Sequence, residues 1–151
     1  MYVPGEGDLG CSWNVAKGRK VVTCALVGTT PSYRATVSEL GAAVYLRTKA
    51  GRIVPLQAWR NERPARRRPV RARGATPGRR YEFPPAGVTA SLAGTDILCK
   101  WTPAFDGHIE CSTVRPGMTY GLFLTREQIA IVRHTPGQLP SLIWAHKQPA
   151  T

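Results

Sequence analysis

The sequence is poor in acidic residues and has no long apolar run. Nine Asp and Glu stand against 21 Lys and Arg, which gives a formal net charge of +12. No segment approaches the roughly 18 apolar residues that a membrane-spanning helix needs. The opening residues, MYVPGEGDLG, have neither a basic start nor an apolar stretch. We therefore expect no membrane span and no cleaved export signal.

The sequence also lacks the motifs of several catalytic and metal-binding classes. It has no Cys-x₂-Cys pair and no Gly-rich phosphate loop. His108-Ile109-Glu110 resembles the His-x-Glu of zinc deaminases, but the Pro-Cys-x-x-Cys that completes that metal site is missing. Asp106, His108 and Glu110 would share one face of a strand, so they form the candidate set for acid–base catalysis. Because no nucleophile accompanies them, we expect polar hairpin residues, no enzymatic activity, no cofactor and no metal.

The composition favours short strands. A chain of 151 residues with 42% hydrophobic content can form a core, and its 13 Pro and 15 Gly include four Pro-Gly pairs suited to type II turns. Thr125 to His134 is the best helix candidate, but its β-branched residues favour a strand. We predict an all-β chain. The apolar runs read as strands are 21–23, 35–37, 44–46, 53–56, 88–92, 97–101, 109–114, 120–124, 128–133 and 141–145.

A unit of about 50 residues occurs twice, which indicates a repeated scaffold. CSWNVAKGRKVVTC, from Cys11 to Cys24, is followed 88 residues later by CKWTPAFDGHIEC, from Cys99 to Cys111. A tyrosine lies nine positions after the second cysteine of each stretch. The matched positions are Cys11 and Cys99, Trp13 and Trp101, Cys24 and Cys111, and Tyr33 and Tyr120, and Trp59 and Trp144 come near the end of each copy.

One stretch resembles a known family. GTTPSYRATVSELGAAVYLRTKAG, residues 28–51, is similar to the Gly-x-Thr-x-x-x-Tyr…Asp-x-Gly…Val-x-Val pattern of bacterial and phage immunoglobulin-like repeats. The resemblance implies two tandem immunoglobulin-like β-sandwich units, residues 1–60 and 81–151, joined by an Arg- and Pro-rich linker, residues 61–80. Only ten residues precede Cys11, so the first unit would be abbreviated, with an open edge or core. The implied core anchors are Trp13, Trp101, Tyr33 and Tyr120.

The four cysteines leave three alternatives open. A hairpin closed by Lys17-Gly18 would place Cys11 opposite Cys24 at a non-hydrogen-bonded pair, close enough for a disulfide. A five-residue loop from Pro103 to Gly107 would do the same for Cys99 and Cys111. Free buried thiols and a metal site are the alternatives, although the spacing of twelve or thirteen residues disfavours a metal.

The basic charge is concentrated in one segment. Residues 60–80 hold nine Arg and one Glu, so this segment carries +8 and the rest of the chain only +4. Bidentate contacts to phosphate suit Arg, but no aromatic residue lies between Trp59 and Tyr81 to stack on bases. The segment therefore reads as an extended linker or a docking arm for an acidic protein surface, with nucleic acid as the alternative. Its Arg residues are Arg60, Arg63, Arg66, Arg67, Arg68, Arg71, Arg73, Arg79 and Arg80.

These features together predict a non-enzymatic structural or adhesion protein. Immunoglobulin-like repeats of the kind this chain resembles are common on phage capsids and tails, so we expect a virion component, either a capsid decoration or a tail protein. Such a protein is synthesised in the host cytoplasm and needs no signal peptide. It would dock on acidic neighbouring virion subunits within a larger assembly. The alternative is a nucleic-acid-binding protein, ribosome-associated or genome-packaging, that uses the Arg-rich segment.

Overall fold

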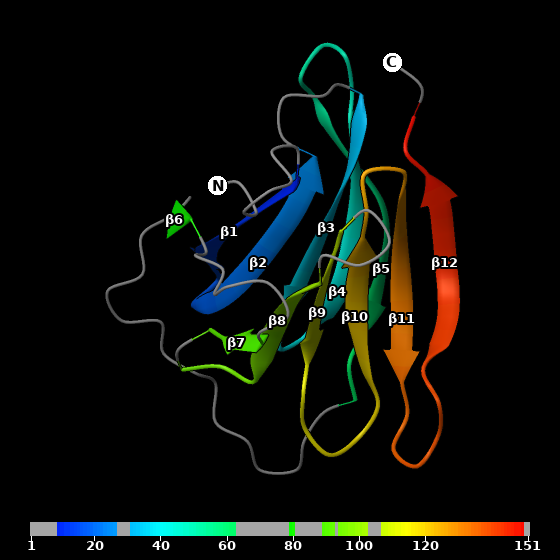
Figure 1. The fold of residues 1–151 in the computed structure, drawn as a ribbon. Coiled ribbons are helices and arrows are strands. Elements are labelled where there is room, and N and C mark those ends of the chain that lie inside the picture. Colours follow the sequence, from blue (N-terminus) through cyan, green and yellow to red (C-terminus); the bar gives the residue numbers. More distant parts are fainter. Residues whose placement is uncertain are drawn as a thin grey trace.

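Two antiparallel β-sheets make up the part of the protein that the structure describes (Figure 1). The computed structural model describes residues 9–26, 31–62, 79–80, 89–92, 94–102 and 107–149. Within these ranges every regular element is a strand, so the all-β prediction is confirmed. The strands follow one another in chain order within each sheet, except that β6 (Arg79–Arg80) lies beside β1 (Leu9–Ala16).

The first sheet contains the first repeat, in the order β5-β4-β3-β2-β1-β6. Its hairpin of β1 and β2 closes over Lys17 and Gly18, whose φ angles of 52° and 76° are the positive pair that a tight two-residue turn requires. The strands are β1 Leu9–Ala16, β2 Arg19–Leu26, β3 Ser32–Ser38, β4 Gly41–Arg47, β5 Ile53–Arg60 and the short edge strand β6 Arg79–Arg80.

The second sheet repeats this arrangement in the order β12-β11-β10-β9-β8-β7. The helix candidate at residues 125–134 forms strand β11, as its β-branched residues favour. The last ladder of each sheet contains one register shift, between Val44 and Tyr45 in the first sheet and between Ile131 and Val132 in the second. The strands are β7 Thr89–Ser91, β8 Ile97–Thr102, β9 His108–Thr113, β10 Thr119–Leu124, β11 Gln128–His134 and β12 Ser141–Lys147.

The two sheets pack face to face and share one hydrophobic core (Figure 1). Alternate residues of the central strands point inward, among them Val22 and Val37 from the first sheet and Ile109 and Ile131 from the second, all with 0% exposure. The resemblance implies that each repeat forms a sandwich of its own. In the described strands each repeat supplies one sheet, and the buried face of one repeat is covered by the other.

Matched residues of the two repeats meet each other across the core. Trp59 lies 6.2 Å from its counterpart Trp144, between ring centroids. The contacts are also reciprocal, because Tyr33 packs on Trp144 at 5.8 Å and its counterpart Tyr120 packs on Trp59 at 6.4 Å. Reciprocal contacts of this kind are the mark of a two-fold interface. The chain therefore has the internal geometry of a symmetric dimer joined into one polypeptide.

Residues that follow β5 tie the first sheet to the second. Asn61 is 4% exposed; its Nδ2 donates to the Glu39 carbonyl at 3.1 Å, and its Oδ1 accepts from the Tyr120 N–H at 2.7 Å. The next residue, Glu62, accepts the Met118 N–H at 2.8 Å through Oε2. We call Asn61 and Glu62 the clasp, because each of them makes one bond that crosses to the second sheet, to Tyr120 and Met118.

Candidate functional site

The cysteines form two disulfides that face each other across the core. Cys11 is bonded to Cys24 between β1 and β2, and Cys99 to Cys111 between β8 and β9. These are the partners that the hairpin registers place opposite each other. The Sγ atoms of Cys24 and Cys111, which are matched positions of the repeat, are 3.9 Å apart. Each disulfide thus joins strands of one sheet, and no disulfide joins the sheets within the described residues.

The four aromatic anchors lie at or beside the core. Trp101 is 1% exposed and Tyr120 is 9% exposed, whereas Trp13 and Tyr33 are partly buried against the core. The ammonium group of Lys20 lies 5.0 Å from the centre of the Trp13 ring. The Tyr33 N–H donates to Gln148 Oε1 at 3.0 Å, which ties β3 to the residue after β12. All four residues serve packing between the sheets.

The predicted Arg-rich arm lies mostly outside the described residues. Arg60, at the end of β5, is exposed, and the backbone of Arg79 and Arg80 forms β6 beside β1. The other six, Arg63, Arg66, Arg67, Arg68, Arg71 and Arg73, fall outside the described ranges. The docking role predicted for them stays a prediction.

An open groove lies on the outer face of the second sheet, at two of the three candidate acid–base residues. His108 Nε2 and Glu110 Oε1 are 3.4 Å apart, and the His108 ring packs on Phe123 at 4.7 Å between centroids. Asp106 falls outside the described residues. The one hydroxyl lining the groove, on Thr125, is engaged by the N–H groups of Glu127 and Gln128. The described groove therefore offers an acid–base pair but no activated nucleophile.

The outer face of β3, β4 and β5 carries a basic and apolar surface. Cross-strand partners share a face of a sheet, and the ladders pair Arg34 with Tyr45 and Tyr45 with Pro55, while Arg47 pairs with Ile53. We call Arg34, Tyr45, Arg47, Ile53 and Pro55 the β3–β5 face. Arg47, Ile53 and Pro55 are exposed, and Ile53 retains 45% of its accessible surface.

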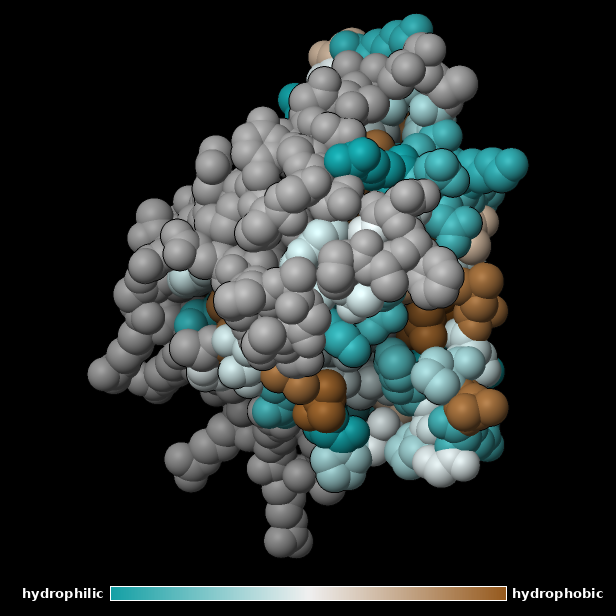
Figure 2. All heavy atoms as spheres, viewed as in Figure 1, coloured by the Kyte–Doolittle hydropathy of each residue, from teal (hydrophilic) through white to brown (hydrophobic). Residues whose placement is uncertain are grey.

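Strand β5 is exposed from Ile53 to Ala58. It is an edge strand, paired on one side with β4. Val54 and Leu56 are 39% and 45% exposed along the same strand, and Val54, the cross-strand partner of Leu46, lies on the face opposite to Ile53. The space-filling view shows hydrophobic groups separated by hydrophilic ones on the side of the molecule that it presents (Figure 2). An exposed apolar edge strand is a frequent site of association with another chain.

Both charged residues of the β3–β5 face, Arg34 and Arg47, are positive. Burial and the neighbouring Arg47 charge lower the pKa of Arg34. Residues 41–60 contain Arg47, Lys49, Arg52 and Arg60 and no Asp or Glu. Two guanidinium groups that repel each other on one face favour an anionic partner, because its charge would relieve the repulsion.

Sequence reasoning missed the β3–β5 face. Its residues come from three strands, and only the register brings them together. The signal was present in the sequence as the absence of acidic residues from 41 to 60, a stretch that also contains the apolar run IVPL. The sequence predicts docking by residues 60–80 instead, because their positive charge is much larger.

Comparison with protein-family models, curated proteins and solved structures finds no match to this chain. The resemblance to immunoglobulin-like repeats thus stays a prediction that rests on its motifs. In the part of the chain that the structure describes, no helix has the length and apolar character to cross a membrane.

Proposed function

We propose that this protein is a non-enzymatic structural module that docks on an acidic surface of a neighbouring protein subunit through the β3–β5 face. The observation that carries the proposal is the edge strand β5, which leaves Ile53 and Pro55 exposed on the same face as Arg47. An apolar centre gains free energy when it is covered, and the surrounding positive charges select and orient an acidic partner.

The geometry of β5 favours covering of its face over addition of a new strand. Pro55 has no N–H, and a proline in an edge strand normally turns that missing donor toward solvent. The register shift beside Tyr45 also twists the edge. Both features weaken the row of hydrogen bonds that a donated strand would need, so we propose that the partner covers the side chains of the face.

We further propose that the neighbouring subunits belong to a phage virion. Two features support this setting. Disulfides persist on virion surfaces and outside cells, and this chain holds two of them in its core. The repeat also resembles phage immunoglobulin-like repeats. Capsid and tail genes beside the gene for this chain are expected, whereas a ribosomal or regulatory neighbourhood would argue against the virion setting.

Binding to defined probes tests the docking surface. The probes are a peptide that alternates Glu with Ile and Val, a peptide of equal length and charge that alternates Glu with Ser, and a single-stranded oligonucleotide of equal charge. We expect the apolar-acidic peptide to bind most tightly. Replacing Arg47→Glu and Arg52→Glu together should weaken this binding at least about tenfold, because each reversal puts like charges together.

The matched control reverses two exposed lysines far from the face, Lys17→Glu and Lys100→Glu, so that the net charge changes equally. If both double variants lose the same affinity for the apolar-acidic peptide, the loss reflects net charge alone. That result would contradict a defined docking surface. If the oligonucleotide binds most tightly of the three probes, and both double variants lose the same affinity for it, the nucleic-acid alternative is favoured.

A further inference from the structure

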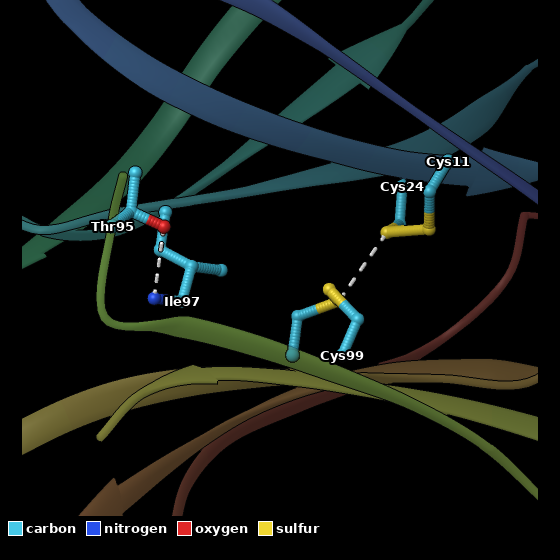
Figure 3. The surroundings of a disulfide bond; sticks show 6 residues. Cys11, Cys24, Thr95, Ile97 and Cys99 are labelled. Atoms are coloured by element: carbon cyan, nitrogen blue, oxygen red, sulfur yellow. Dashed lines mark hydrogen bonds between the residues drawn. A yellow bond between two sulfur atoms is a disulfide. The ribbon is translucent and has the colours of Figure 1, made fainter. Parts of the chain in front are cut away.

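The two disulfides bring four sulfur atoms together at the centre of the sandwich. The Sγ atoms of Cys11, Cys24 and Cys111 all lie within 4.8 Å of one another, and Cys99 is bonded to Cys111. Figure 3 shows the Cys11–Cys24 pair and Cys99 pointing toward each other from facing sheets. All four residues are at most 2% exposed. The cluster is thus a closed group of sulfur atoms from four strands.

We propose that, when both disulfides are reduced, these four cysteines form a buried, all-thiolate site for one Zn²⁺ ion. One of the distances between the two pairs already has the required size. Zn–S bonds of about 2.3 Å in a tetrahedron place neighbouring sulfurs about 3.8 Å apart, and the Sγ atoms of Cys24 and Cys111 are 3.9 Å apart. The site is independent of the docking function proposed above.

The two-fold relation between the repeats is compatible with a tetrahedral site. Cys24 and Cys111 are matched positions of the repeat, and so are Cys11 and Cys99. A tetrahedron has two-fold axes that exchange its corners in pairs, so an ion on the axis between the repeats would meet two equivalent pairs of ligands. The usual zinc-site signal, a Cys-x₂-Cys pair, is absent because each ligand comes from a different strand.

Formation of the site requires a reductant and releases protons. Each disulfide reacts with one molecule of a dithiol, which becomes a cyclic disulfide and leaves two protein thiols. Four thiols then bind Zn²⁺ as thiolates and release four protons, and the ion cancels two of the four negative charges.

Metal titration of the reduced protein tests the site. Reduction uses a phosphine, which consumes one water per disulfide and becomes the phosphine oxide, so that no dithiol competes for metal. Co²⁺ is added without oxygen and then displaced by Zn²⁺. We expect one Co²⁺ per chain with the absorption of a tetrahedral thiolate site, and release of four protons on Zn²⁺ binding. The oxidised protein should bind neither ion.

A cysteine double variant and the unfolded chain serve as controls for the metal titration. Cys11→Ser with Cys24→Ser leaves two thiols and should weaken Co²⁺ binding at least about 100-fold. The reduced wild-type chain in urea should also bind weakly, and Zn²⁺ should raise its urea midpoint as the ion concentration rises. Binding that is equally tight in urea, metal bound by the oxidised chain at its histidines, or no binding by the reduced chain would each overturn the proposal. None of these readouts depends on the folding of the variant.

Discussion

At the scale of single residues, Asn61 makes one buried connection between the sheets. Its side chain satisfies the Tyr120 N–H and the Glu39 carbonyl, and both bonds are buried. Asn61→Ala leaves both groups without that partner, so we expect a loss of roughly 2–4 kcal/mol in the free energy of unfolding, measured in urea. Asn61→Asp keeps an acceptor for Tyr120 but sets a buried carboxylate oxygen against the Glu39 carbonyl oxygen, so it should lose at least as much.

An exposed residue of β5 supplies the control for this prediction. Gln57→Ala changes a side chain on the surface and should alter the free energy of unfolding by no more than about 0.5 kcal/mol. Equal stability of Asn61→Ala and Gln57→Ala would show that the clasp does not hold the sheets together.

The anchors and the cysteine partners could be predicted because both depend on local pattern. Lys17-Gly18 is a two-residue turn, and it fixes which residue of β2 lies opposite Cys11. Asn61 gave no signal, because a polar residue after a strand reads as a loop until the chain that covers it is known. Its burial depends on Tyr120, which lies 59 residues away.

At the scale of elements, each disulfide reinforces one hairpin. The two loops span 13 and 12 residues, so removing either bond should cost a similar amount. We expect about 2–4 kcal/mol for Cys11→Ala with Cys24→Ala, and nearly the same for Cys99→Ala with Cys111→Ala, because loops of this length lose similar entropy on closure. Urea unfolding of both double variants, each with its other disulfide intact, measures the difference. If only one of the double variants lost free energy of unfolding, the two disulfides would not have equivalent roles in stability.

The strands were predictable, and the way they pair between repeats was not. Period-two alternation identifies β3 as a strand with one inward face, as Ala35 and Val37 show. Alternation says nothing about what that face contacts. Either a sandwich within each repeat or one sandwich from both repeats satisfies the same pattern, and only the contacts of Tyr33 with Trp144 and of Trp59 with Tyr120 distinguish them.

At the scale of the whole molecule, the shared core predicts that the two repeats stay together after the chain is cut between them. A protease site inserted after Val70 would separate the repeats covalently, since each disulfide lies within one repeat. We expect both fragments to elute together in size-exclusion chromatography, because separation would expose the apolar faces of both sheets. Fragments that elute separately without denaturant would contradict a common core.

The internal two-fold arrangement has a consequence for how the surface can diversify. In a dimer of identical chains, any change to an outer face appears on both sides at once. In this chain the position of Arg34 on the first sheet is matched by Gly121 on the second, where an added Cβ would lie 2.7 Å from the Cys111 carbonyl oxygen. One side can therefore present arginines while the other carries the groove of His108 and Glu110. Joining two copies in one chain keeps a common interior and gives the molecule two separately adjustable exteriors.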